Sequence, residues 1–286
     1  MSRFISVFRS RRGWALLSAN FSFSFAALAG IVQLILAVRP TAELQGGRMI
    51  VGMIALSCLW AVARSVPRQS IDRNFKQPDF SVIVKVGDLF AEQSDLIVGF
   101  TDVFDTSTEG GDIISLRSVQ AQFLDKVFSR DASALDEALE AALSGSLVHE
   151  SESEVSKPRG KRDRYPLGTV AVVANGSFKY YCVAYSRMSN DLVARSSVDY
   201  LWQSLNSVWS TVASSGHLEP VAIPVLGSDL ARVGSLGRES LIKMIVLSFV
   251  ARSRVSLVSR KLTVVVHPSG ADEVNLSEVQ AFLRSL

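Results

Sequence analysis

An uncharged apolar run over residues 14–38 constrains this chain more than any other feature of its sequence. As an α-helix rising 1.5 Å per residue, the run is about 37 Å long, which is enough to cross a hydrocarbon layer of about 30 Å with some tilt. A second apolar run, residues 49–63, is about 22 Å long and spans only with its flanking residues included. We therefore predict a transmembrane hairpin over residues 1–66, with spans at 14–38 and 47–64.

A secretory signal peptide is the alternative interpretation of this N-terminal segment. Its basic start fits, but the apolar core of 25 residues is too long, and a second apolar run follows soon after it. We therefore interpret the segment as a membrane anchor.

Basic residues gather beside the two predicted spans and indicate their orientation. Those before the first span are Arg3, Arg9, Arg11 and Arg12, and those after the second are Arg64, Arg68, Arg73 and Lys76. The positive-inside rule then predicts a multi-pass protein of the inner (cytoplasmic) membrane, with the N-terminus and the C-terminal domain in the cytoplasm. Membrane lipid is a sufficient partner for these residues, so the net charge of +3 does not require nucleic acid.

Small residues recur every fourth position on one face of the first span, and these are Ser18, Ser22, Ala26 and Gly30. Such faces let helix backbones approach closely, and close packing is what drives helix association in lipid. The face fits packing between the two spans of one chain, and it fits assembly between chains equally well.

The part of the chain after the hairpin alternates between short β-branched runs and amphipathic segments. Residues 67–79 are polar with prolines, so we expect a linker there and a single domain over residues 80–286. The expected strands are 81–86, 95–100, 169–174, 180–185, 220–226 and 262–267, and the expected helices are 115–128, 132–143, 192–214, 236–251 and 276–286. This alternation predicts an α/β fold with a sheet covered on both faces.

Residues 144–164 interrupt this alternation with serines and charges and no hydrophobic period. We expect an exposed, disordered insertion. Its basic end, which contains Lys157 and Arg164, leaves a lid over an anionic ligand or a lipid tether as minor alternatives.

Metal and nucleophile motifs are absent from the sequence. The three histidines are scattered, and there is no CxxC, HExxH or GxSxG. Cys58 and Cys182 give no disulfide framework and fit a reducing compartment. We therefore expect no metal site and no catalytic residue.

Glycine-bearing segments follow three of the expected strands. They begin at Gly87, at Gly110-Gly111 and at Gly227. Ligands of open α/β sheets bind at the carboxyl ends of the strands, where glycines let backbone N–H groups approach phosphate. Three such segments at one sheet edge favour a nucleotide cleft.

These segments together resemble the Macro domain, the ADP-ribose-binding fold, over about residues 80–270. The matching stretches are Gly87-Asp88-Leu89-Phe90, residues 95–102 (Asp-Leu-Ile-Val-Gly-Phe-Thr-Asp), Gly110-Gly111-Asp112-Ile113, Tyr165-Pro166-Leu167-Gly168 and residues 223–229 (Ile-Pro-Val-Leu-Gly-Ser-Asp). The resemblance implies a three-layer α/β/α domain with a mixed sheet, no cofactor, and an ADP-ribose derivative as ligand.

Carried over to this sequence, the resemblance assigns residues to parts of the ligand. It implies Asp88 and Leu89 at the adenine, Gly110, Gly111 and Asp112 at the distal ribose, and Gly227, Ser228 and Asp229 at the diphosphate. Thr101, Asp102, Leu230 and Arg232 complete the expected binding set.

Two positions depart from the Macro pattern. Asp102 stands where Macro hydrolases carry an asparagine, and Asp229 replaces a glycine of the diphosphate loop, where Arg232 is a nearby cation. A carboxylate repels a diphosphate. The departures argue against ADP-ribosyl hydrolysis and for a ligand with an extra, cationic group at Asp102.

A two-span hairpin joined to a divergent Macro domain resembles the membrane effectors of type II Thoeris antiphage systems. The resemblance implies that a TIR-domain enzyme makes the nucleotide signal, which is an ADP-ribose conjugate, and that the effector then forms homo-oligomers and disrupts the membrane. A membrane-tethered ADP-ribosyl hydrolase is the second hypothesis, and a passive membrane-anchored reader of ADP-ribosylated partners is the third.

Overall fold

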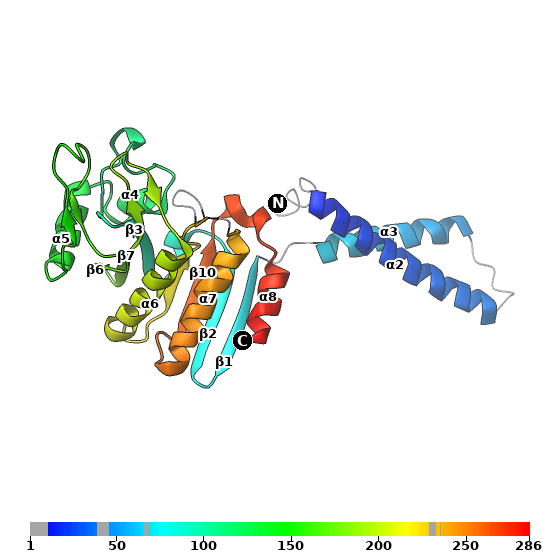
Figure 1. Ribbon diagram of the computed structural model, residues 1–286. Helices are drawn as coiled ribbons and strands as arrows, with labels where there is room; N and C mark the ends of the chain where they lie inside the picture. The colour runs from blue at the N-terminus through cyan, green and yellow to red at the C-terminus, as the bar shows by residue number, and fades with distance from the viewer. Residues whose placement is uncertain (1–10, 39–45, 66–68, 229–232, 235) are drawn as a thin grey trace. The chain divides into compact units, whose positions relative to one another are not determined.

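The computed structural model describes residues 11–38, 46–65, 69–228, 233–234 and 236–286. The chain divides into two units, Met1–Arg68 and Gln69–Leu286 (Figure 1). The predicted basic residues Arg3 and Arg9 lie outside the described residues.

The first unit contains two helices that pack on each other, α2 (Arg11–Val38) and α3 (Gly46–Ser65). Segments Leu17–Val38 and Gly47–Arg64 are long and apolar enough to cross a membrane. The two helices therefore agree with the predicted spans, and they suggest membrane association by length and composition.

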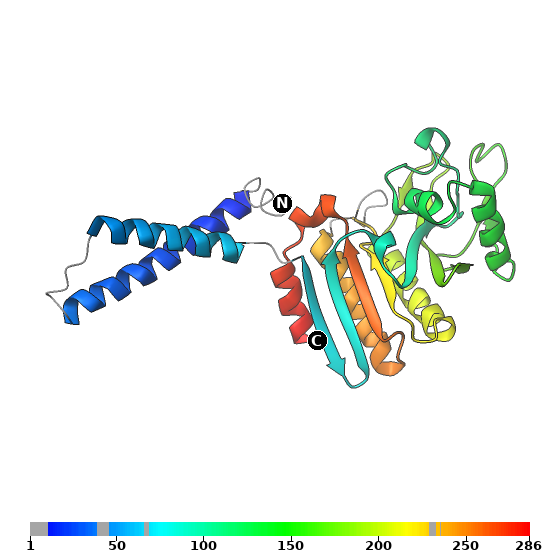
Figure 2. The same ribbon diagram turned by 180° about the vertical axis from the view of Figure 1, so that it is seen from behind.

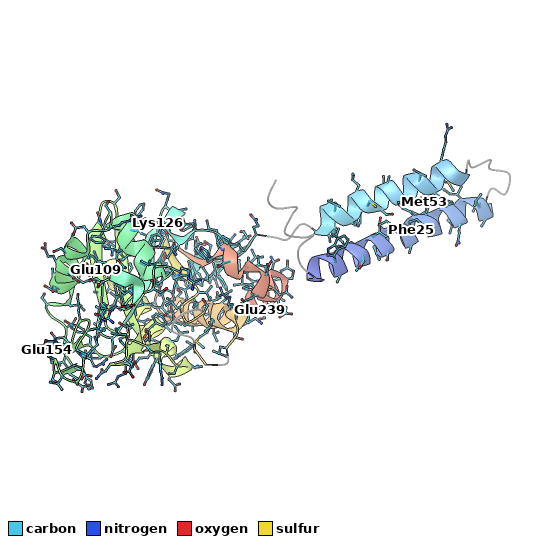
Figure 3. The ribbon with its side chains drawn as sticks, turned by 90° about the horizontal axis from the view of Figure 1, so that it is seen from above. Phe25, Met53, Glu109, Lys126, Glu154 and Glu239 are labelled. Atoms are coloured by element: carbon cyan, nitrogen blue, oxygen red, sulfur yellow. The ribbon has the colours of Figure 1, made fainter. Side chains whose placement is uncertain are left out.

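The small-residue face of α2 does not form the contact inside the hairpin. The α2–α3 contact involves Leu17, Phe21 and Ala61, and Phe25 and Met53 lie partly buried on the two helices (Figure 3). In contrast, the four residues of the small-residue face are all exposed, namely Ser18, Ser22, Ala26 and Gly30. Within one chain the hairpin packs without this face.

The second unit is built on one mixed sheet in the order β1-β2-β10-β9-β3-β7-β6. The five strands β2, β10, β9, β3 and β7 are parallel, and β1 and β6 run antiparallel at the two edges. Strand bounds are β1 Ser70–Lys76, β2 Asp79–Val86, β3 Asp95–Thr101, β6 Val170–Asn175, β7 Phe178–Met188, β9 Val221–Pro224 and β10 Lys261–Val266, and a short β8 (Ala194–Arg195) pairs with β7.

Helices cover both faces of the sheet, because its strands alternate between two apolar cores. In β3, Ile97 joins the core under α6, α7 and α8, whereas Leu96 and Val98 join the core under α4 and α5 (Figures 1 and 2). The helix bounds are α4 Val119–Val127, α5 Ala132–Leu143, α6 Val198–Ser215, α7 Arg238–Val255 and α8 Leu276–Ser285. This arrangement confirms the predicted three-layer α/β/α fold with a mixed sheet.

Side-chain caps explain where several of these helices begin. Ser118, Asp131, Ser197 and Asn275 each accept a hydrogen bond from a backbone N–H in the first turn of α4, α5, α6 and α8, respectively.

The structure differs from the predicted linker over residues 67–79. Residues 70–76 form β1, which pairs with β2 in register through all seven residues. The strand buries only Ile71 and Phe75, so its composition is as polar as that of a linker. An edge strand with few buried residues gives a weak sequence signal.

The structure also differs from the predicted disorder over residues 144–164. Glu150–Ser151 (β4) pairs with Asp163–Arg164 (β5) in a hairpin. Lys157 is fully buried and Arg164 is 3% exposed, although both belong to the segment expected to be solvated. The segment is therefore a folded part of the domain.

Candidate functional site

The carboxyl ends of the five parallel strands lie along one edge of the sheet. The segments that leave this edge contain η1 (Leu89–Ala91) after β2, η2 (Glu109–Gly111) after β3, the β9–α7 connection, and η3 (Pro268–Glu273) after β10. All three predicted glycine segments are among them. The structure therefore brings the three glycine segments to one edge of the sheet, which is where open α/β sheets bind ligands.

Strands β3 and β9 separate as they approach this edge. Their ladder holds only two residue pairs, Asp95 with Val221 and Leu96 with Ala222. Side chains of Tyr185 and Leu226 fill the space over Gly99, where an added Cβ would lie 2.5 Å and 2.8 Å from them. The order of the sheet also reverses here, which is where ligands bind in open α/β sheets.

Gly227 forms the turn that follows β9. Its φ is +78°, and an added Cβ would lie 2.5 Å from Cγ2 of Val233. The N–H of Val233 donates to the Gly227 carbonyl (3.1 Å), so the two residues close a short loop. Only glycine fits both requirements. Ser228 is partly buried beside it, and the predicted Asp229, Leu230 and Arg232 lie outside the described residues.

Asp88 caps η1 at the first of the glycine turns. Its carboxylate accepts from the Phe90 N–H (3.0 Å) and pairs with Nζ of Lys126 of α4 (2.6 Å). Lys126 is labelled in Figure 3. The hydrogen bond from Lys126 holds the pKa of the Asp88 carboxyl below its usual range, and the hydrogen bond from the Phe90 N–H acts in the same direction. Leu89 is buried against the core under α4.

Gly110 and Gly111 lie in η2, where both have positive φ values (+65° and +72°). The next residue, Asp112, pairs with Arg159 of the 144–164 segment at 2.7 Å, and both side chains are more than half exposed. Asp112 is thus accessible to a ligand, and its ion pair with Arg159 is open to solvent.

Asp102, at the end of β3, already has a cation beside it. Arg164 Nη1 lies 2.8 Å from its carboxylate, and the N–H of Met188 donates to the other oxygen (2.8 Å). Arg164 also donates to Glu152, which is partly exposed, and to Asn190, which is exposed, whereas Asp102 and Arg164 themselves are each 3% exposed. A cationic ligand group would reach Asp102 only by displacing Arg164. Thr101 is buried, and its hydroxyl has no hydrogen-bond partner among the described residues.

Four basic residues of the 144–164 segment pair with carboxylates elsewhere in the domain. Lys157 lies 3.7 Å from Asp105, Arg159 pairs with Asp112, Lys161 with Asp136 (2.5 Å) and Arg164 with Asp102. Burial raises the pKa of Asp105 and lowers that of Lys157. These pairs were not predicted, because the partners lie 25 to 62 residues apart in the sequence and the local pattern does not reveal them.

One cavity lies apart from the three predicted glycine turns, and a second adjoins the first of them. One of about 430 Å³ lies between α5 and the 160–165 segment and is lined by Phe104 and Tyr165 among others. The other, of about 220 Å³, lies beside Phe90, Ser94 and Tyr180. The described part of the chain contains no His, Cys, Asp and Glu group that could hold a metal ion.

Comparison with known proteins identifies the family. Residues 82–267 match the family described as Thoeris protein ThsA, Macro domain. The curated Thoeris protein ThsA of Bacillus amyloliquefaciens (strain Y2) is 22% identical over 207 residues, covering 70% of this chain and 67% of that protein.

The solved structures of a macrodomain from Oceanobacillus iheyensis are similar to this chain in fold. A variant with ADPR has a TM-score of 0.51 and 14% identity, with 76% of this chain and 100% of that chain covered. The same macrodomain with ADP has a TM-score of 0.49 and 14% identity, with coverage of 76% and 97%. The family match extends over well more than half of the sequence, so the chain belongs to the Thoeris ThsA family with a Macro domain.

Proposed function

We propose that the domain binds an ADP-ribose derivative at the carboxyl edge of its sheet. The observation that carries this proposal is the Gly227 turn, which follows the central strand β9 and admits no side chain. Backbone N–H groups of such a turn suit a diphosphate. Family membership and the ADPR and ADP complexes of the similar macrodomain support the same ligand class.

In this proposal Asp88 and Leu89 meet the adenine, Gly110 to Asp112 flank the distal ribose, and Gly227 to Asp229 enclose the diphosphate. Asp88 supports its part, because its half-exposed carboxylate can accept from an exocyclic amine. Leu230 and Arg232 belong to the same diphosphate loop.

We favour a binding protein over a hydrolase. A hydrolase requires a base that can activate water near the distal ribose. Asp102 is bound by Arg164 and the Met188 N–H, and Asp112 is paired with Arg159. Asp102 is buried and bonded on both oxygens, and the exposed Asp112 is neutralised by a cation, so the ADP-ribosyl hydrolase is the weaker hypothesis.

The chain as a whole acts, in this proposal, as a membrane effector of Thoeris antiphage defence. A TIR-domain enzyme supplies the nucleotide signal, and ligand binding promotes homo-oligomers that disrupt the inner membrane. The two candidate spans and the exposed small-residue face of α2 support this role. The N-terminus and the Macro domain face the cytoplasm, where the signal is made.

Calorimetric titration of the full chain in detergent micelles with ADP-ribose and its amino-acid conjugates tests the ligand proposal. Gly227→Val should abolish the binding heat, because its side chain collides with Val233. Gly145→Ala is the matched control, since an added Cβ there meets nothing within 4 Å. Absence of heat with the unmodified chain and every compound would remove the proposal.

A further inference from the structure

Strand β1 forms one edge of the sheet, and half of its backbone polar groups point away from the domain. Its ladder partner among the described strands is β2. The N–H of Val86 donates to the carbonyl of Gln69 (2.8 Å), which fixes the phase of the ladder. Bonded positions alternate in an antiparallel pair, so residues 71, 73 and 75 bond to β2. The N–H and C=O groups of Ser70, Asp72, Asn74 and Lys76 therefore point outward.

The side chains of these four residues are exposed as well. Helix α8 packs on the other side of the strand, where Ile71 and Phe75 are buried and Arg73 donates to the Arg284 carbonyl (3.3 Å). Figure 2 shows β1 and β2 from the side that no helix covers. The edge therefore combines backbone groups that no ladder among the described strands uses with a row of polar side chains.

We propose that this edge is a self-association surface, at which β1 pairs antiparallel with β1 of a second copy of the chain. A two-fold axis at Asn74 sets the register. Asp72 of each copy then lies opposite Lys76 of the other, and this pairing occurs twice. Opposite charges at directly opposed positions stabilise a strand pair.

The charges select this register over its neighbours. An axis at Arg73 places two guanidinium groups opposite each other, and an axis at Asp72 does the same with two carboxylates. Like charges at directly opposed positions destabilise a strand pair. Asn74 facing Asn74 carries no such penalty.

The partner is a second copy because the row of charges is complementary to itself. A charged edge strand also serves elsewhere to prevent strand pairing. Charge reversal distinguishes an edge that pairs with a second copy from an edge that prevents pairing. It changes the affinity between two copies only in the first case, because a protective row of charges has no preferred partner.

This inference rests on the assembly step of the proposed function and deepens it, but its test needs no ligand.

Disulfide cross-linking uses the full chain in detergent micelles. Cys58 is exposed and is replaced by serine (Cys58→Ser) so that it cannot react, whereas Cys182 is buried and burial raises the pKa of its thiol. Asn74→Cys places two sulfurs at a bonded pair, where Cα atoms lie about 5.5 Å apart, within disulfide range. Ser70→Cys is the matched control, since its two copies lie about 27 Å apart in this register.

The expected result is a disulfide-linked dimer for Asn74→Cys after mild oxidation and none for Ser70→Cys. Equal cross-linking of the two variants, or none in either, would overturn the proposal. Both side chains are exposed on a face of the strand, so neither change removes a packed contact.

Charge reversal gives the second measurement, which is the dimer dissociation constant by analytical ultracentrifugation. Asp72→Lys or Lys76→Asp alone should weaken the dimer about tenfold, since two attractive pairs become repulsive. The double variant should restore it. Unchanged dimerisation in the single variants, or no rescue in the double variant, would contradict β1 pairing.

Calorimetry on the same variants separates this inference from the ligand proposal. Binding heat that survives a loss of dimerisation supports β1 as an assembly surface distinct from the ligand site. A chain that binds no ligand ends the functional proposal, and the cross-linking result still decides the β1 interface.

Discussion

Arg164 is the residue on which the most contacts converge. Its guanidinium donates hydrogen bonds to Asp102, Glu152, Asn190 and the Met188 carbonyl, and its side chain is 4% exposed. Removing one partner of a buried pair leaves an uncompensated charge. We therefore expect Arg164→Ala to lower the free energy of unfolding by about 3–5 kcal/mol, measured by denaturant unfolding of the full chain in micelles.

Arg159→Ala is the control for this prediction. Its pair with Asp112 is more than half exposed on both sides, so the change should cost less than about 1 kcal/mol. Arg164→Lys should restore little, because a point charge cannot donate in four directions. A loss for Arg164→Ala no larger than that for Arg159→Ala would contradict the role given to Arg164.

Asp88 gives a prediction about pH. Its pKa is lowered by Lys126, so the pair stabilises the fold above the ordinary carboxyl pKa of 3.8, and this stabilisation is lost as pH falls through the lowered value. Lys126→Ala should raise the Asp88 pKa, as measured by carbon NMR of the labelled carboxyl. An unchanged titration would show that Lys126 does not hold this carboxylate.

The residues of the glycine turns were predictable from the sequence, whereas the fate of Asp102 was not. Gly227 follows a β-branched run and must bend the chain, which local chemistry reveals. The partner of Asp102 lies 62 residues away in a segment that reads as solvated. Burial of a charge depends on such a distant partner, and a single sequence does not show it.

At the scale of elements, the 144–164 segment gives a sharp test at Gly160. Its φ is +76°, and an added Cβ would lie 2.8 Å from Asp105 Oδ1 and 3.0 Å from Lys157 Nζ. Gly176 has a similar φ of +62° but open space around it. Both alanine variants pay about 1–2 kcal/mol for the backbone, but Gly160→Ala should cost more because it also crowds the buried pair.

Thermal unfolding of the two variants measures this difference. Equal midpoints for Gly160→Ala and Gly176→Ala would mean that the Lys157–Asp105 contact adds nothing to the packing of the segment.

The elements that the sequence predicted well are those with a buried face. Strands β2, β3, β7, β9 and β10 and helices α4 to α8 each carry apolar residues at the expected period, so the layer order followed from their alternation. Strand β1 and the β4–β5 hairpin were not predicted, because each buries only two side chains. These strands form because their backbones pair with a neighbouring strand, and backbone pairing does not require a recognisable residue composition.

At the scale of the whole molecule, the exposed small-residue face of α2 is the element to change. Ser22→Leu together with Gly30→Leu should leave ligand binding intact and abolish toxicity in cells, since bulky residues prevent close helix packing. Ala27→Leu with Ile31→Leu is the matched control on another exposed part of the same helix. Toxicity that persists in the first variant would make the hairpin an anchor only.

Gating is a separate prediction for the whole chain. A ligand shifts assembly only if it binds the assembled state better than the resting one. Liposomes that contain the full chain should therefore leak dye faster with an ADP-ribose conjugate than without it. Equal leakage in both conditions would contradict ligand gating.

The short ladder between β3 and β9 has a mechanical consequence. The sheet is two half-sheets, β1-β2-β10-β9 and β3-β7-β6, fastened at their amino ends by two residue pairs. Beyond these pairs no ladder among the described strands joins the two halves, and the side chains of Tyr185 and Leu226 lie over Gly99 there. A molecule held by both the Gly227 turn and the end of β3 would therefore join the two half-sheets at the end where the strands themselves do not pair.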